Sequence, residues 1–138
     1  MAIVIVDDST TNLIVLRSLS AKIYKDETKG FTDSQEAASY LAANPADLIV
    51  VDYSMPGLNG VDFIRAVRSS PLHTTTPIIM VTNSSDQSVR LQAMRAGATD
   101  FLNKPVEAIE FKSRVTEHLL RHDAQQKAAA VAAVAAVA

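Results

Sequence analysis

The segment that decides the fold is IVIVDDS, residues 3–9, in which four β-branched apolar residues run directly into Asp7 and Asp8. An apolar run without polar alternation is typical of a strand that is covered on both faces. Similar runs lie at residues 48–51 and 78–81, and the first of these is followed by another acid, Asp52. The sequence therefore predicts three buried parallel strands, two of which lead into carboxylates.

Amphipathic stretches and two weaker apolar runs fill the intervals between these strands. We predict helices at residues 12–23, 34–43, 61–67, 86–96 and 107–121, and further strands near residues 28–31 and 99–102. Five strand–helix units in alternation are typical of an α/β fold, a doubly wound five-stranded parallel sheet with helices on both faces. Gly97 and Pro77 stand where a helix ends and a strand begins, in agreement with this division.

Composition and charge exclude several classes of protein. The 138 residues are 48% hydrophobic, as in an ordinary globular chain. The 13 basic and 15 acidic residues give a net charge of −2 without a basic cluster, which argues against direct binding of nucleic acid or of an anionic membrane. Cysteine is absent, so disulfides and thiolate metal sites are excluded, and we expect a cytoplasmic protein.

The end of the chain differs from the rest. We expect one domain over residues 1–122 and a separate segment over residues 123–138, of which residues 128–138 contain only Ala and Val. Alanine gives this segment a high helix propensity. A helical extension, a linker towards an output domain and a cloning remnant are all compatible with it.

Polar side chains follow four of the predicted strands at the edge where doubly wound sheets bind ligands. These residues are Asp7, Asp8, Asp52, Thr82 and Lys104. Carboxylates held together raise one another's pKa unless a cation compensates their charge. Mg²⁺ prefers oxygen ligands and commonly uses one or two carboxylates together with a phosphate oxygen. The sequence therefore predicts a magnesium site at this edge, with Lys104 as a further positive charge.

In their order and spacing these residues resemble response-regulator receiver domains of two-component signalling, over residues 1 to about 122. The shared features are residues 5–9, the D-x-x-M-P-x-x-x-G spacing from Asp52 to Gly60, Thr82, Phe101 and the pair Lys104-Pro105. The resemblance implies a flavodoxin-like strand order, 2-1-3-4-5. It also implies a cis peptide bond between Lys104 and Pro105.

The same resemblance implies a role for each site residue. Asp52 would be the nucleophile that accepts a phosphoryl group from a sensor histidine kinase, a phosphotransfer protein or a small phosphodonor. Asp7, Asp8, Asp52 and the backbone carbonyl of Ser54 would hold Mg²⁺. The protein would phosphorylate itself and slowly lose the phosphoryl group, without the turnover of an enzyme.

Two further residues would bind phosphate or change position with it. Lys104 and Thr82 would contact the phosphoryl oxygens, and Thr82 and Phe101 would form a switch. The switch would alter the face made by the fourth helix, the fifth strand and the fifth helix, where a homodimer or a C-terminal output domain outside this chain could bind. Candidate exposed contacts on this face are Arg90, Arg95, Lys112 and Arg114.

Each site residue also has an ordinary structural explanation. Asp7 and Asp8 could cap the first helix, Asp52 could belong to a turn, and Phe101 could be a core aromatic. Thr82 could be a strand-end hydroxyl, and Lys104 a solvated loop residue.

Two other functions compete with the receiver. A Mg²⁺-dependent phosphohydrolase would place an acid two residues after Asp52, where this chain has Ser54. An interaction module that never carries phosphate would typically lack one of the site residues.

Several polar residues outside these signatures carry separate expectations. His73 lies in a predicted loop. His118 and His122 have the spacing of a helical metal pair, but no third ligand is evident, and we expect them at a solvated helix end. Asn83 stands where receivers usually have a smaller residue, which could restrict bulky phosphodonors. Ser54 and Ser84 lack the amide or acid that could orient water, so we predict a long-lived phosphoryl group.

Overall fold

A computed structural model describes residues 2–23, 27–83 and 86–137, and these residues form one parallel sheet with helices on both faces. The strands are β1 (Ala2–Val6), β2 (Glu27–Phe31), β3 (Leu48–Asp52), β4 (Ile78–Thr82) and β5 (Asp100–Asn103). They pair in parallel in the order β2-β1-β3-β4-β5. The predicted fold class and strand order are confirmed.

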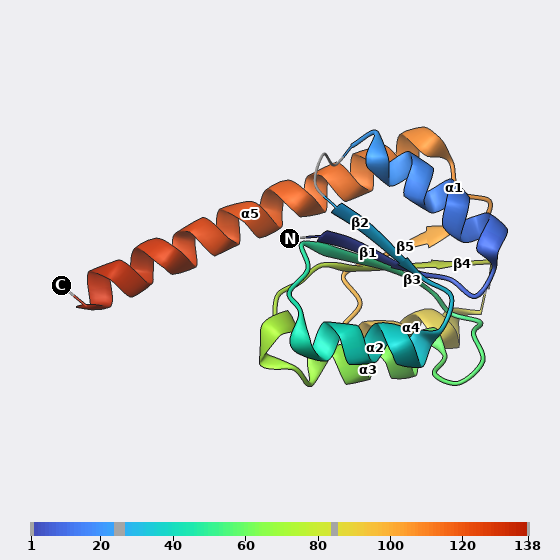
Figure 1. Cartoon of the computed structure of the whole chain (residues 1–138), viewed down its shortest axis with the longest axis horizontal. Helices are drawn as coiled ribbons and strands as arrows, with labels where there is room; N and C mark the ends of the chain where they lie inside the picture. The colour runs from blue at the N-terminus through green and yellow to red at the C-terminus, as the bar shows by residue number, and fades with distance from the viewer. Residues whose placement is uncertain (1, 24–26, 84–85, 138) are drawn as a thin grey trace.

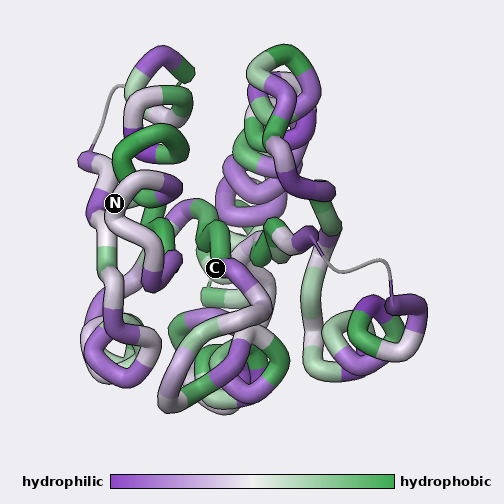
Figure 2. The backbone as a smooth tube through the Cα atoms, turned by 90° about the vertical axis from the view of Figure 1, so that its right-hand side faces the viewer, coloured by the Kyte–Doolittle hydropathy of each residue, from purple (hydrophilic) through white to green (hydrophobic). Residues whose placement is uncertain are grey.

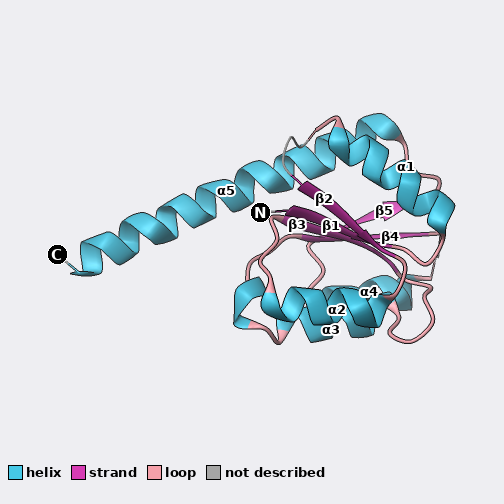
Figure 3. Ribbon diagram, viewed as in Figure 1, coloured by secondary structure: helices cyan, strands magenta, loops and turns pink. Residues whose placement is uncertain are grey.

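The helices cover the sheet in two layers. They are α1 (Thr10–Ala21), α2 (Ser34–Ala43), α3 (Gly60–Arg68), α4 (Gln87–Ala96) and α5 (Ala108–Val137), with a 3₁₀ turn η1 (Pro71–His73) before β4. Figure 1 and Figure 3 show α1 and α5 on one face of the sheet and α2, α3 and α4 on the other.

The two faces of the sheet make two separate cores. Val4 of β1 packs in the core beneath α2 to α4, whereas its neighbours Ile3 and Ile5 pack in the core beneath α1 and α5. Successive side chains of a strand point to opposite faces, so both sets of residues must be apolar when both faces are covered. Colouring by hydropathy shows apolar and polar residues alternating along the helices (Figure 2).

The carboxyl ends of the strands meet at one edge because the sheet is parallel. The register pairs Val6 with Val51, Asp52 with Val81 and Thr82 with Asn103. The turns that leave β1, β3, β4 and β5 therefore start side by side, although they are far apart in sequence.

Capping residues set the helix boundaries. Ser9 accepts a hydrogen bond from Asn12 N at 3.3 Å, so α1 begins at Thr10, two residues before the predicted start. Asp33 caps α2 through Gln35 N and Glu36 N, and Asp86 caps α4 through Ser88 N. Gly97 ends α4 with φ of 117°, the left-handed conformation expected there.

The last helix continues beyond its predicted end at residue 121. α5 runs to Val137, and from Asp123 onward its described residues are exposed. Figure 1 shows this half of α5 projecting away from the sheet. No described helix is both long and apolar enough to cross a membrane.

The expectation that His118 and His122 lie at a solvated helix end is wrong. His73, His118 and His122 are 0%, 6% and 5% exposed. The two on α5 follow Phe111 and Val115 at helical spacing, on the face that packs against the sheet. His73 is held by Thr76 Oγ1 at 3.1 Å and by the carbonyl of Leu41 at 2.7 Å.

Candidate functional site

Three carboxylates gather where β1 and β3 end. Asp7 and Asp8 follow β1, and Asp52 is the last residue of β3. Each offers one oxygen, and the three oxygens lie within 4.8 Å of one another. Asp7 is 1% exposed and Asp52 is 8% exposed, whereas Asp8 is open to solvent. Two of the three acids are therefore buried, and solvent reaches the third, Asp8. The three oxygens could hold a hard divalent cation.

Lys104 brings a positive charge to the two buried acids. Its Nζ lies 3.0 Å from Asp52 Oδ2 and 3.2 Å from Asp7 Oδ2. Its backbone N donates to Thr82 O at 3.0 Å, and its bond to Pro105 is cis, as the resemblance implied. The lysine is thus directed into the site, and its interpretation as a solvated loop residue is wrong.

Burial and charge act in opposite directions on these groups. Burial raises the pKa of Asp52 above its ordinary value, although the hydrogen bond and charge of Lys104 oppose this effect. Burial would lower the pKa of Lys104, but the hydrogen bonds and charges of Asp52 and Asp7 outweigh it and the pKa is raised. Lys104 is therefore firmly protonated, and Asp52 ionises less readily than an exposed aspartate.

Asp7 and Asp8 are not the helix cap that their position allowed. The capping side chain of α1 is Ser9, and the first turn of this helix contains no acid. Asp7 Oδ1 accepts a hydrogen bond from Ser9 N at 2.9 Å, and its other oxygen faces Lys104. Asp7 is thereby fixed from both sides.

Close packing positions the loop between β3 and α3. A Cβ on Gly60 would lie 2.6 Å from the backbone oxygen of Asp52 and 2.8 Å from Tyr53 Cα. Gly60 N donates to Tyr53 O at 2.8 Å. The loop can therefore fold back onto the end of β3 only with glycine at this position. Ser54 is exposed at the start of the loop, and its role as a carbonyl ligand stays a prediction.

One residue that supports the site was missed from the sequence. Ser34, at the start of α2, is 1% exposed. Its hydroxyl donates to Pro56 O at 3.3 Å and accepts from Leu58 N at 3.1 Å, which anchors the loop after Asp52. A serine next to the capping Asp33 gave no signal of this contact, because its partners lie 22 and 24 residues away.

Thr82 and Phe101 lie on neighbouring strands. Thr82 is 1% exposed at the end of β4, and Phe101 on β5 is partly buried against the core beneath α2 to α4. The guanidinium carbon of Arg90 lies 5.8 Å from the centre of the Phe101 ring. Phe101 therefore contacts both the core and the side chain of Arg90. Its role as a switch stays a prediction.

The expectation that four basic residues are exposed is only half correct. Arg95 and Lys112 are exposed, but Arg90 and Arg114 are partly buried. Arg90 contacts β5, and Arg114 Nη1 donates to Asp100 Oδ1 at 2.7 Å. These two arginines join elements of the domain to one another.

A cleft of about 470 Å³ opens between α1 and the segments that follow β4 and β5, where Lys104 lines it. Its lining is formed by Asn12, Val15, Leu16, Asn83, Lys104, Pro105 and Val106. Asn83 and Lys104 line the same cleft, and the expected influence of Asn83 on phosphodonors stays a prediction. Ser84, the other residue after β4 to which we gave a role, lies outside the described residues.

The site combines a buried carboxylate, further acids for a cation and a lysine that neutralises negative charge. An aspartate can attack phosphorus directly, without a general base. Phosphoryl transfer depends mainly on positioning and charge neutralisation, and this arrangement can provide both.

Comparison with known proteins agrees with this geometry. The family model of the response regulator receiver domain matches residues 3–116. The cyclic di-GMP phosphodiesterase response regulator RpfG of Xanthomonas campestris is 37% identical over 85% of this chain and 31% of its own length. The chemotaxis protein CheY of Pseudomonas aeruginosa is 30% identical over 83% of this chain and 93% of its own length.

A solved structure supports the same assignment. The signal receiver domain of a signal transduction histidine kinase from Syntrophus aciditrophicus is 30% identical, with a TM-score of 0.77 over 86% of this chain and 89% of its own. The chain spans less than a third of RpfG and 25% of the response regulator PleD of Caulobacter vibrioides. It therefore corresponds to one domain of these larger relatives. By sequence, fold and strand order, the chain belongs to the response regulator receiver domain family, the phosphoacceptor signalling domains of two-component systems.

Proposed function

We propose that Asp52 accepts a phosphoryl group in a reaction that requires Mg²⁺, and that this modification switches the surface formed by α4, β5 and α5. The observation that carries the proposal is the convergence of three carboxylate oxygens within 4.8 Å, with Lys104 bridging Asp7 and Asp52. A purely structural cluster would not need three acids beside one lysine, because like charges destabilise one another.

The proposed reaction begins with an attack by an Asp52 carboxylate oxygen on phosphorus. The new bond from this oxygen to phosphorus forms as the bond from phosphorus to the donor's leaving atom breaks, and the donor keeps the electron pair. The product is an acyl phosphate on Asp52. Lys104 Nζ lies 3.0 Å from Asp52 Oδ2, and this short distance supports a role in which its ammonium would pair with the incoming phosphoryl oxygens.

The remaining acids would serve the metal. Asp8, which is exposed, and Asp7, which is buried and fixed by Ser9 N, would hold Mg²⁺ together with Asp52 and the backbone carbonyl of Ser54. When bound, Mg²⁺ would neutralise negative charge shared by the carboxylates and the phosphoryl group.

The switch would use Thr82 and Phe101. The Thr82 hydroxyl would hydrogen-bond a phosphoryl oxygen, and the Phe101 ring would move inward with it. Phosphate binding can shift such an equilibrium only by the difference between its affinities for the two conformations.

The partners follow from the family. We propose a sensor histidine kinase or a phosphotransfer protein as the phosphodonor. The switched surface would bind a second copy of the chain or an output domain. Enzymatic turnover is not part of the proposal, because position 54 is a serine where an acid would be needed.

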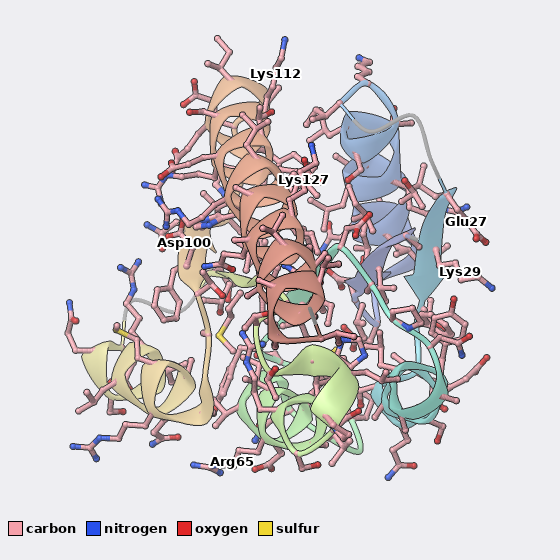
Figure 4. All side chains as sticks on the ribbon, turned by 90° about the vertical axis from the view of Figure 1, so that its left-hand side faces the viewer. Glu27, Lys29, Arg65, Asp100, Lys112 and Lys127 are labelled. Atoms are coloured by element: carbon pink, nitrogen blue, oxygen red, sulfur yellow. The ribbon has the colours of Figure 1, made fainter. Side chains whose placement is uncertain are left out.

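The decisive experiment is labelling of the chain by acetyl phosphate with and without Mg²⁺, in the wild type, in Asp52→Asn and in Asp62→Asn. Asp62 is an exposed aspartate on α3 and serves as the matched control. It forms an ion pair with Arg65, which can be found in Figure 4. We expect Mg²⁺-dependent labelling of the wild type and of Asp62→Asn, and none of Asp52→Asn. Equal labelling of all three proteins would end the proposal.

A further inference from the structure

Arg90 joins α4 to β5 at two points. Its guanidinium carbon lies 5.8 Å from the centre of the Phe101 ring, and its Nη2 donates to Asn103 Oδ1 at 2.5 Å. Phe101 and Asn103 are two residues apart in a strand, so their side chains leave the same face of the sheet. The guanidinium therefore spans this pair, making a cation–π contact with one residue and a hydrogen bond to the other.

The two residues under Arg90 adjoin the proposed switch. The strand register places Phe101 opposite Met80 and Asn103 opposite Thr82. Asn103 also precedes Lys104, whose backbone N donates to Thr82 O at 3.0 Å. Arg90 therefore contacts Phe101, which would move on phosphorylation. It also contacts Asn103, which is the neighbour of Thr82 and of Lys104.

We propose that Arg90 is a latch that holds Phe101 in the position it has in this structure, partly buried and beside α4, and so opposes the movement of the ring that phosphorylation of Asp52 would cause. This inference rests on the proposed function, which it deepens by naming the residue that opposes the switch. Arg90 acts through Phe101 and does not touch the acids, so it is a positioning residue.

The direction of the effect follows from where Arg90 is anchored. Its second contact, Asn103, belongs to a strand whose end is paired with β4 next to Thr82. If Phe101 moves inward, the guanidinium either stays at Asn103 and loses the ring, or follows the ring and loses Asn103. The position of the ring in this structure keeps both contacts, and the loss of either one opposes phosphorylation.

The size of the effect can be stated as a change in apparent affinity. The loss of either the cation–π contact or the hydrogen bond, at a partly exposed position, alters a two-state equilibrium by about three- to tenfold. A ligand that binds only the inward conformation gains apparent affinity by the same factor when the latch is removed.

The test uses beryllofluoride, an analogue of the phosphoryl group, titrated into the full chain at saturating Mg²⁺. Binding is followed through the backbone amide signals of Phe101 and Thr82 by NMR. The proteins are the wild type, Arg90→Ala, Asn103→Ala and the control Arg95→Ala, which changes an exposed arginine on the same helix. Mg²⁺ binding without beryllofluoride is measured in parallel, because a general disturbance of the site would alter it and loss of the latch would not.

We expect Arg90→Ala to reach half-saturation at about three- to tenfold lower beryllofluoride. Asn103→Ala should move the same way by a smaller factor, and Arg95→Ala should match the wild type. Unchanged or weaker binding by Arg90→Ala, or an equal gain in Arg95→Ala, would overturn the latch and leave the proposed function intact. A wild type that does not respond to beryllofluoride with Mg²⁺ would refute the proposed function and the latch together.

Discussion

The carboxylate of Asp52 occupies a position from which water is nearly excluded, and its ionisation therefore carries an energetic cost. Burial raises its pKa, so the folded chain holds the Asp52 proton more tightly than the unfolded chain does. Stability linked to this proton is fully present below the ordinary pKa of 3.8 and is lost as the pH rises through the folded value. At neutral pH without a bound metal ion, the ionised carboxylate of Asp52 therefore destabilises the domain.

We therefore predict that Asp52→Asn melts a few degrees higher than the wild type at pH 7 in the presence of EDTA. The difference should shrink as the pH falls towards 4, because the wild-type carboxylate then takes up a proton. Thermal unfolding followed by circular dichroism at both pH values measures this change. A lower melting temperature for Asp52→Asn at pH 7 would mean that the ion pair with Lys104 outweighs the cost of burial.

Gly60 is a second residue at which a small substitution should have a large effect, because there is no room for a Cβ atom. An added Cβ would meet backbone atoms of Asp52 and Tyr53 at 2.6 and 2.8 Å, and backbone cannot move aside as a flexible side chain can. We predict that Gly60→Ala costs about 2 kcal/mol or more in the free energy of unfolding and also reduces labelling of Asp52.

The matched control is Gly57→Ala in the same loop. Gly57 has φ of 79°, but a Cβ there would only touch Gln35 at 3.5 Å. Its replacement should cost about 1 kcal/mol, from the left-handed backbone alone, and should leave labelling unchanged. Chemical denaturation of the two variants measures both costs, and equal effects would contradict the role of close approach to Asp52.

At the scale of elements, Asp100 fastens α5 to β5. Its Oδ1 accepts from Arg114 Nη1 at 2.7 Å and from Phe101 N at 2.8 Å, and its Oδ2 lies 2.9 Å from His118 Nε2. Figure 4 shows Asp100 on β5 beside the long helix. Burial would raise the pKa of Asp100, but the hydrogen bonds of Arg114 and His118 outweigh it and the pKa is lowered.

We predict that Asp100→Asn costs about 1–3 kcal/mol at pH 7, because it weakens bonds to Arg114 and His118 in a partly buried place. The stabilising effect of this carboxylate is present above pH 3.8 and is lost as the pH falls further, so the two proteins should converge in strong acid. Glu117→Gln is the control, since its pair with Arg121 is exposed and should contribute about 0.5 kcal/mol or less. Urea denaturation at pH 7 compares the three proteins, and similar losses in both variants would contradict a special role for Asp100.

The elements themselves could be predicted because their signals are local. The apolar runs that end at Val6 and Val51 needed only their own composition, and the acids that follow them marked the functional edge. The side-chain partner of His118 could not be predicted, because it is Asp100, 18 residues away on another element. The same limit applies to Ser34 and Arg90, whose partners lie 22 to 24 and 11 to 13 residues away.

At the scale of the whole molecule, the chain divides into a packed body and a projecting helix. α5 contributes Phe111 and Val115 to the core, and its last buried residue is His122. Beyond that point Val131, Val134 and Val137 are 69%, 71% and 88% exposed. These side chains bury little hydrophobic surface, so this half of the helix does not contribute to the core of the domain.

We predict that a chain ending at Asp123 melts within about 2 °C of the full chain, because the described residues removed are all exposed and an isolated alanine-rich helix of this length is only marginally stable. The cut is placed after His122 because that side chain is buried. Mg²⁺-dependent labelling of Asp52 should also be unchanged. A second chain ending at Glu117 should unfold at a much lower temperature, since it loses the buried His118 and His122 together. If both truncated chains were equally destabilised, the exposed half of α5 would have to support the body through contacts between copies of the chain, which a concentration-dependent melting temperature of the full chain would reveal.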